Sequence, residues 1–255
     1  MVEPMSRVAV VGDGETASRA RRAVEEAGGR LVERAAADAV VAVGDDAIRG
    51  VLVAESGSSP PSHGRPVVPV RNGEEPGDRT HVTSTIRALL DGTARRVPYP
   101  ILSVEADGAT AGKAVFDVAF VTDEPARISE YAVEITEDRH ESFRADGVAI
   151  ATPLGSEGYA NAAGGPVIGP GAGLAVVPIA PFTTRRDTWV VSDGVTLSVE
   201  RESEAVSLVV DGSRREVVVP GQSIRVGIAD RVDVVPGPPS SAPGRAIDRK
   251  GSNNS

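Results

Sequence analysis

Hydroxyl groups and small residues are concentrated in one stretch of the chain, between Asp146 and Pro166. The apolar run at 148–151 predicts a buried strand. The sequence Thr-Pro-Leu-Gly-Ser at 152–156, which follows it, cannot continue a strand or a helix. Polar side chains beside Gly164-Gly165 are typical of a surface against which a flat, phosphate-bearing ligand lies closely. The alternative is a tight loop between two strands, rich in glycine only because the chain turns.

Two carboxylates follow the most apolar strand of the first half of the chain. Residues 39–43 (AVVAV) predict a buried strand, and Gly44, Asp45 and Asp46 come directly after it. In open α/β sheets, ligands bind at the carboxyl ends of the strands. A carboxylate at that edge serves as a general base or helps to hold a metal ion. The alternative is structural, because Asp46 before Ala47 would cap a helix.

The stretch at 146–166 also resembles the signature loop of the NAD kinase family, which transfers a phosphoryl group to the 2′-hydroxyl of the adenosine ribose of NAD. The shared pattern is D-G-x-x-x-x-T-P-x-G-S-x-x-Y-x-x-x-A-G-G-P. Leu154 and Glu157 stand where the family usually has threonines, and Ala162 stands where it usually has a serine. The residues that the resemblance implies to line a dinucleotide pocket are Asp146, Thr152, Ser156 and Tyr159.

Residues 43–47, V-G-D-D-A, resemble the family motif G-G-D-G-T, whose aspartate is the catalytic base. The resemblance implies that Asp45 is the base and that Gly44 and Asp46 bind phosphate. Val43, Asp46 and Ala47 depart from the motif. Because a carboxylate at position 46 repels the phosphates of a nucleotide, a bridging Mg²⁺ is expected.

Two further places are similar to family motifs. Phe116-Asp117 stands where the family has Asn-Glu or Asn-Asp, which holds the ribose hydroxyls; Asp117 fits this role, whereas Phe116 cannot make the contacts of an asparagine. Arg185 and Arg186 follow P-I-A-P-F, similar to the family's P-x-x-P-H, and are predicted to pair with phosphates. The alternatives are an outward polar residue on a half-buried strand for Asp117 and a solvated pair for the two arginines.

Together these residues imply an NAD kinase-like phosphotransferase that uses ATP with Mg²⁺ and converts NAD into NADP. The resemblance also implies a homodimer or homotetramer. Two alternatives stay open: a dinucleotide-binding or regulatory relative without turnover, and a kinase of another alcohol. The histidines, at positions 63, 81 and 140, have no metal-ligand spacing, so no residue is assigned to a metal.

Composition excludes several other classes of protein. The formal net charge of −9 argues against nucleic acid as a partner. The chain has no cysteine, which excludes disulfides and thiolate metal sites. No apolar stretch approaches the length of a membrane span and no signal peptide is evident, so a cytoplasmic protein is expected. Scarce lysine and aromatic residues are typical of proteins from salt-loving or high-GC organisms.

The predicted secondary structure changes near residue 97, from alternating strands and helices to strands alone. Strands and helices alternate over residues 1–96, which predicts an α/β domain. Short strands separated by turn signals fill residues 97–235 and predict an all-β domain, in which Asp211-Gly212 is a hairpin turn. The expected fold is thus an α/β N-terminal domain followed by a β-rich, β-sandwich-like C-terminal domain. Residues 236–255, rich in Pro, Gly, Ser and Asn, are expected to be a disordered tail.

A second glycine-rich turn lies near the N-terminus. Gly12-Asp13-Gly14 separates a strand predicted at 7–11 from a helix predicted at 15–27. Such a turn is similar to a dinucleotide fingerprint, in which the helix start binds a phosphate. No acidic residue follows a clean second strand at the expected distance, so an ordinary strand-turn-helix is favoured.

Overall fold

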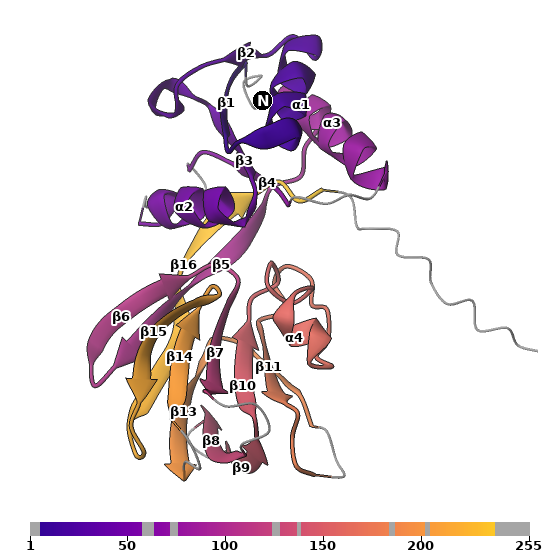
Figure 1. Cartoon of the computed structure of the whole chain (residues 1–255). Coiled ribbons are helices and arrows are strands. Elements are labelled where there is room, and N and C mark those ends of the chain that lie inside the picture. Colours follow the sequence, from indigo (N-terminus) through magenta and orange to yellow (C-terminus); the bar gives the residue numbers. More distant parts are fainter. Residues whose placement is uncertain are drawn as a thin grey trace, which may run out of the picture.

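The computed structural model describes residues 6–57, 64–71, 76–123, 128–136, 139–183, 187–201 and 205–237. In these ranges the chain forms two β-sheets, one of ten strands and one of six. The long helices lie at one end of the molecule and the strand-rich part lies at the other (Figure 1). The predicted order, an α/β region followed by a β-sandwich-like region, is therefore confirmed. Most of the predicted tail, from residue 238, lies outside the described residues.

The first region is a parallel sheet in the strand order β2-β1-β3-β4. Successive side chains of β3 enter different cores: Val41 and Val43 pack with α1 and α3, whereas Val40 and Ala42 pack with α2. This burial on both faces explains why β3 is a continuous apolar run. The elements are β1 (Arg7–Val11), α1 (Gly14–Glu26), β2 (Arg30–Leu31), η1 (Arg34–Ala36), β3 (Ala39–Val43), α2 (Asp45–Glu55), β4 (Val67–Val70) and α3 (Pro76–Leu90).

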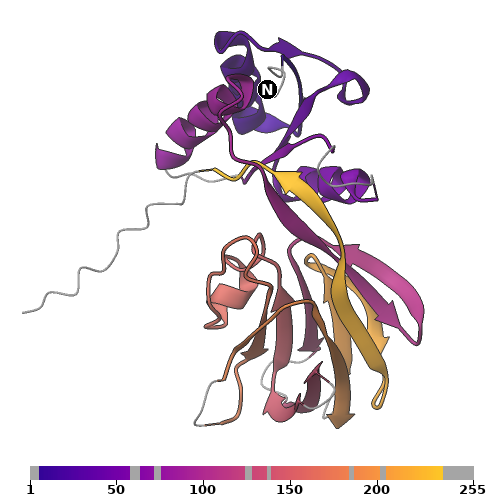
Figure 2. The same ribbon diagram turned by 180° about the vertical axis from the view of Figure 1, so that it is seen from behind.

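Two long strands carry the sheet from the first region into the second. β5 (Val97–Ala106) pairs antiparallel with β16 (Ser223–Val234) along almost its whole length. β16 also pairs with β4, through the single bridge Val234↔Val67. Seen from behind, β16 runs from the helical part down into the strand-rich part (Figure 2). The ten-stranded sheet is therefore common to both regions.

The second region is a sandwich of the two sheets around one apolar core, to which Phe120, Tyr131, Ile150 and Leu197 contribute. The ten-stranded sheet continues through β6 (Ala109–Ala114), β13 (Gly194–Arg201), β8 (Ser129–Thr136) and β9 (Arg139–Ala145). The six-stranded sheet has the order β12-β11-β10-β7-β14-β15. Its strands are β7 (Asp117–Thr122), β10 (Gly147–Ala151), β11 (Leu174–Ile179), β12 (Trp189–Val191), β14 (Val206–Val210) and β15 (Ser213–Val218), and the short helix α4 (Tyr159–Ala162) follows β10.

Several elements differ from the expectation. Pro69 interrupts the apolar run at 66–70, which predicts an edge strand; this prediction is wrong, since β4 lies between β3 and β16. Proline is tolerated there because the pairing with β16 ends at Val67, so the position of Pro69 needs no N–H on that side. The apolar run at 114–121 predicts a single strand, but the structure breaks it into β6 and β7 by a bend at residues 115–116. The charged stretch at 139–145 predicts no strand, but it forms β9. Within the described residues, no helix has the length and apolarity that a membrane span requires.

Candidate functional site

The bend between β6 and β7 is the base on which the loop after β10 is built. The hydroxyl of Thr152 donates a hydrogen bond to the carbonyl oxygen of Val115, at 2.7 Å, and its backbone N–H donates to that of Phe116, at 2.9 Å. The same hydroxyl accepts the N–H of Gly155, at 3.2 Å. A single buried threonine thus fixes both ends of the Thr-Pro-Leu-Gly-Ser turn against the neighbouring strand.

Glycine at position 155 is required by close packing. A Cβ atom there would lie within 3.0 Å of the carbonyl oxygen, carbonyl carbon and Cα of Phe116. One residue further on, the buried hydroxyl of Ser156 donates to Pro153 O, at 2.9 Å, and accepts the N–H of Ile168, at 3.1 Å. The predicted ligand contacts of Thr152 and Ser156 stay a prediction; what their hydroxyls provide in this structure is the shape of the loop.

The carboxylate of Asp211 holds the bend from the other side. It accepts the backbone N–H groups of three successive residues, Val115 (3.0 Å), Phe116 (2.7 Å) and Asp117 (3.1 Å). Its own N–H donates to the carbonyl oxygen of Asp117, at 2.9 Å. Asp211 has a positive φ of 47°, which places its carboxylate under the bend. The Asp-Gly pair is a hairpin turn as predicted, but its carboxylate also orders the strand that carries Asp117.

Both carboxylates of the Gly-Asp-Asp motif are paired with arginines. Asp45 is bound side-on by Arg71, with Nε–Oδ1 and Nη2–Oδ2 distances of 3.1 and 3.2 Å. Asp46 is bound by Arg49 at 2.6 Å, and Arg49 also donates to the carbonyl oxygen of Asp211 at 3.3 Å. The expected repulsion between Asp46 and phosphates is therefore reduced by a cation of the chain itself. Gly44, with a φ of 89°, is the N-cap residue of helix α2, so Asp46 lies in the first turn of the helix and is not its cap.

The guanidinium of Arg71 connects the two regions of the chain. Its Cζ lies 5.0 Å from the centroid of the Phe116 ring, in a cation–π arrangement. Asp45 follows β3, Arg71 follows the adjacent strand β4, and Phe116 belongs to the bend on which Gly155 rests. The carboxylate at position 45 and the loop around Gly155 therefore share one site.

Asp117 has a strongly perturbed carboxyl group. Burial raises its pKa to about 6, the negative charge of Asp211 adds to this rise, and Arg71 opposes it. Burial also raises the pKa of Tyr159, which the carboxylates of Asp117 and Asp146 raise further. The half-exposed phenol of Tyr159 is thus within electrostatic range of both carboxylates.

Asp146 lies at the other end of β10 from Thr152. The register of β10 with β7 places Ala151 opposite Asp117 and Gly147 opposite Val121. Five strand residues separate Asp146 from Thr152, which corresponds to about 16–20 Å at the usual rise per residue. The structure brings together Asp45, Asp117 and the loop at 152–156; Asp146 lies away from the beginning of that loop, but its charge, like that of Asp117, acts on Tyr159. Arg185 and Arg186 lie outside the described residues.

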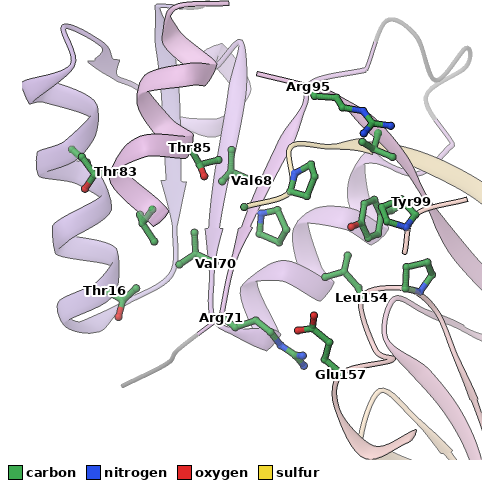
Figure 3. A pocket seen from close by; sticks show the side chains of 18 of the residues that line it. Thr16, Val68, Val70, Arg71, Thr83, Thr85, Arg95, Tyr99, Leu154 and Glu157 are labelled. Atoms are coloured by element: carbon green, nitrogen blue, oxygen red, sulfur yellow. The ribbon is translucent and has the colours of Figure 1, made fainter. Parts of the chain in front are cut away.

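A cavity of about 810 Å³ opens next to these residues, between α1, α3, β4 and the segments 153–157 and 167–170. Its apolar wall includes Val68, Val70 and Leu154, and Tyr99 lies beside Arg95 on another side (Figure 3). The guanidinium of Arg71 and the carboxylate of Glu157 point toward one another at one end. Four arginines and two acids line the cavity: Arg19, Arg22, Arg71, Arg95, Glu26 and Glu157. In a chain of net charge −9, this excess of positive charge suits an anionic ligand.

Sequence reasoning missed Arg71, Arg49 and the cavity. The register Val43↔Val70 places the ends of β3 and β4 side by side, and Gly44 N–H donates to Val70 O at 2.8 Å. Residues that follow adjacent parallel strands meet at one edge of the sheet. Applied to Arg71 as well as to Asp45, that rule would have predicted their contact. Among the described residues, no group of three His, Cys, Asp or Glu side chains has the arrangement of a metal site.

Replacing Asp211 by asparagine is expected to lower the pKa of Asp117 below its value of about 6. The charge of Asp211 favours the protonated form of Asp117, so its removal lets Asp117 ionise at lower pH; the larger effect, burial, stays. Asparagine retains an acceptor oxygen for the bend. The measurement is an NMR titration of the Asp117 carboxyl carbon, with Asp123→Asn, at the far end of β7, as the control. An unchanged titration in Asp211→Asn would contradict the assignment.

Comparisons with known proteins agree with this geometry. Residues 117–234 match the family model of the ATP-NAD kinase C-terminal domain. An NAD kinase of Methanospirillum hungatei is 35% identical over 113 residues, 44% of this chain and 42% of that protein. An NAD kinase of Thermoplasma acidophilum is 30% identical over 149 residues, 57% of this chain and 54% of the relative. The matched part thus spans about half the length of these curated relatives.

Two solved structures share the fold over most of the chain. Yeast NADH kinase, complexed with NADH, has a TM-score of 0.68 at 15% identity, covering 93% of this chain and 85% of that chain. An NAD kinase from Archaeoglobus fulgidus, in complex with ATP, has a TM-score of 0.64 at 23% identity, covering 90% and 93%. At these coverages the similarity extends into residues 1–96, to which the family model does not extend.

Proposed function

We propose that this chain is an NAD kinase, which transfers the terminal phosphoryl group of ATP to the 2′-hydroxyl of the adenosine ribose of NAD and so produces NADP. One observation carries the proposal. Asp45, Asp117 and the Thr-Pro-Leu-Gly-Ser loop, which are far apart in the sequence, all reach the pair formed by Arg71 and Phe116. A base, a diol-binding carboxylate and a close-packed loop are thus assembled beside a nucleotide-sized cavity.

The proposed step is an in-line displacement at phosphorus. A lone pair of the 2′-oxygen forms the new O–P bond, and the bond between the γ-phosphorus and the β–γ bridging oxygen breaks, so that ADP leaves with the electron pair. The proton of the 2′-hydroxyl passes to a carboxylate oxygen of Asp45. Asp117, once ionised, accepts hydrogen bonds from the ribose hydroxyls, and Tyr159 lies on the same side.

The chemistry of the site fits a Mg²⁺ ion bound with ATP. Mg²⁺ takes oxygen ligands and usually combines one or two carboxylates with substrate phosphates. Asp46, whose side chain is 94% exposed, would hold such an ion from the protein side while Arg49 keeps its carboxylate oriented. When bound, the ion would neutralise part of the charge on the transferred group. Gly44, next to Asp45 and without a side chain, would let a phosphate approach the backbone.

An assay for NADP tests the proposal. The purified protein should form NADP from NAD and Mg²⁺–ATP, in low or high salt, and should form none when Mg²⁺ is chelated. NADH in place of NAD, and inorganic polyphosphate in place of ATP, would define the acceptor and the donor. No NADP with any donor at any salt concentration would refute the proposed activity.

A second candidate is a dinucleotide-binding relative without turnover. One observation favours it: the oxygen atoms of the proposed base are already bound by Arg71. Such a protein would be stabilised thermally by NAD but would form no NADP. The same preparation therefore distinguishes the two functions, with melting temperature and product formation as separate readouts.

The resemblance to NAD kinases also supports a homodimer or homotetramer in the cytoplasm. Two large apolar side chains near the edge strand β12, Phe182 and Val190, are 70% and 51% exposed. Contact with another subunit would cover them. Sedimentation velocity would give the number of subunits, and a single monomeric species at micromolar concentration would refute this part of the proposal.

A further inference from the structure

Arg71 occupies a central position that the family motifs do not assign. It follows β4 directly, and its two hydrogen bonds to Asp45 use Nε and Nη2, two of the five N–H donors of a guanidinium. Its side chain is 39% exposed and lines the cavity. A cation that contacts the proposed base and also borders the cavity lies where the acceptor hydroxyl and the phosphoryl donor must meet.

The charges around Arg71 differ on its two sides. Asp45, Asp46 and Asp117 lie toward the strand ends and the bend, with Asp211 beneath them. The cavity on the other side is lined by three further arginines, at positions 19, 22 and 95, and by two acids, Glu26 and Glu157, so that its charge is positive overall. Phosphate groups are attracted to the arginine side and repelled from the carboxylate side. Arg71 lies between the two groups of charges, so a polyphosphate that extends from the cavity toward Asp45 would contact its guanidinium.

The ring of Phe116 fixes the position of the Arg71 guanidinium. Phe116 stands where the family has an asparagine and offers no hydrogen bond, but its ring supports the planar guanidinium from below. Leu154, which replaces a threonine of the loop, packs in the same apolar cluster as Phe116. These two departures from the family pattern therefore build an apolar base that orients one arginine.

Stability alone does not explain the arrangement. The Arg71–Asp45 pair is substantially exposed on both sides, with 39% and 58% of the side chains accessible. Exposed pairs of this kind contribute little to stability because water and salt screen them. A function in ligand binding accounts better for an arginine that is oriented by a ring and borders a cavity.

We propose that Arg71 is a phosphate-binding residue that contacts the phosphoryl group to be transferred and releases Asp45 as it does so. This inference rests on the proposed function. In the resting site the guanidinium occupies both oxygens of Asp45; when a phosphate arrives, the guanidinium turns to its oxygens and Asp45 becomes free to take the 2′-hydroxyl proton. An arginine placed in this way stabilises the charge that spreads over the phosphoryl oxygens during transfer.

The test measures phosphate binding separately from catalysis. Binding of inorganic tripolyphosphate and of Mg²⁺–ATP is measured by titration calorimetry for the wild type, Arg71→Ala and Arg71→Lys. Arg71→Ala should weaken both about tenfold or more, because charge-assisted hydrogen bonds are lost, while NAD binding should change less than about threefold. Arg71→Lys keeps the charge without the planar geometry and should fall between the wild type and Arg71→Ala.

Arg7→Ala is the matched control, because Arg7 binds Asp38 side-on at the surface of the same region, at the opposite end of the strands. Its removal should leave tripolyphosphate binding within about twofold of the wild type, since it borders no part of the cavity. If Arg71→Ala binds tripolyphosphate as tightly as the wild type does, the inference is overturned. If the wild type forms no NADP but Arg71→Ala still loses tripolyphosphate binding, the proposed activity fails and the phosphate contact stands.

Discussion

Replacing Asp45 by asparagine is expected to lower the rate of NADP formation by about 10³-fold while the protein remains folded. General-base catalysis contributes about 10²–10⁴-fold, and an amide cannot take the proton of the ribose 2′-hydroxyl. The side chain of Asp45 is 58% exposed, and its partner Arg71 keeps contact with Phe116, so little stability is at stake. The measurements are kcat and KM for NAD and ATP, with the melting temperature as a check on folding.

The sequence contains a close control for this substitution. Asp38 is also an aspartate bound side-on by an arginine, Arg7, at the opposite end of the parallel strands. Asp38→Asn removes the same charge from the same kind of pair but touches neither the loop nor the cavity. Its rate should remain close to that of the wild type. A rate for Asp45→Asn equal to that of Asp38→Asn would show that the base is elsewhere.

Replacing Gly155 by alanine is expected to abolish dinucleotide binding and to destabilise the fold by about 3 kcal/mol, as overpacking of a well-packed site does. The new Cβ would meet the backbone of Phe116, not a movable side chain. The loop and the bend must then separate, which breaks the two hydrogen bonds from Thr152 to Val115 and Phe116. Urea unfolding gives the free energy, and calorimetry gives the affinity for NAD.

Gly50→Ala serves as a control, because it is expected to change the free energy of unfolding in the opposite direction. Gly50 lies inside α2, where a Cβ would meet nothing within 4 Å. Alanine there should raise the free energy of unfolding by up to about 1 kcal/mol, since glycine is a poor helix former. If both variants changed stability in the same direction, close packing at position 155 would not be the reason for its glycine.

The parts of the site that depend on local sequence were predictable. The loop at 152–156 and the carboxylate after β3 each lie in one continuous stretch, where the types and spacing of the residues carry the information. The alternation of helices and strands before residue 97, and of short strands after it, likewise follows from local periodicity.

What the sequence did not predict depends on contacts between distant residues. The bend at 115–116 looks like a continuous strand, because nothing in A-V-F-D-V interrupts it; the break is stabilised by Asp211 and Thr152, which lie 36 or more positions away. The pairing of Arg71 with Asp45 depends on which strands are neighbours in the sheet. The central position of β4 was missed for a related reason: its neighbour β16 comes from the far end of the described chain.

This position of β16 has a consequence for how the protein is made. A ribosome delivers the chain from its amino end, and early segments generally begin to fold while later ones are still being synthesised. Here β4 and β5 both pair with β16, which is synthesised more than 100 residues after them. Their pairing with β16 therefore forms only when almost the whole described chain has been made. The nascent chain therefore leaves the exit tunnel with one edge of β4 and one edge of the long strand β5 unpaired. Until the final strand is in place, these edges are sites for chaperones and for aggregation.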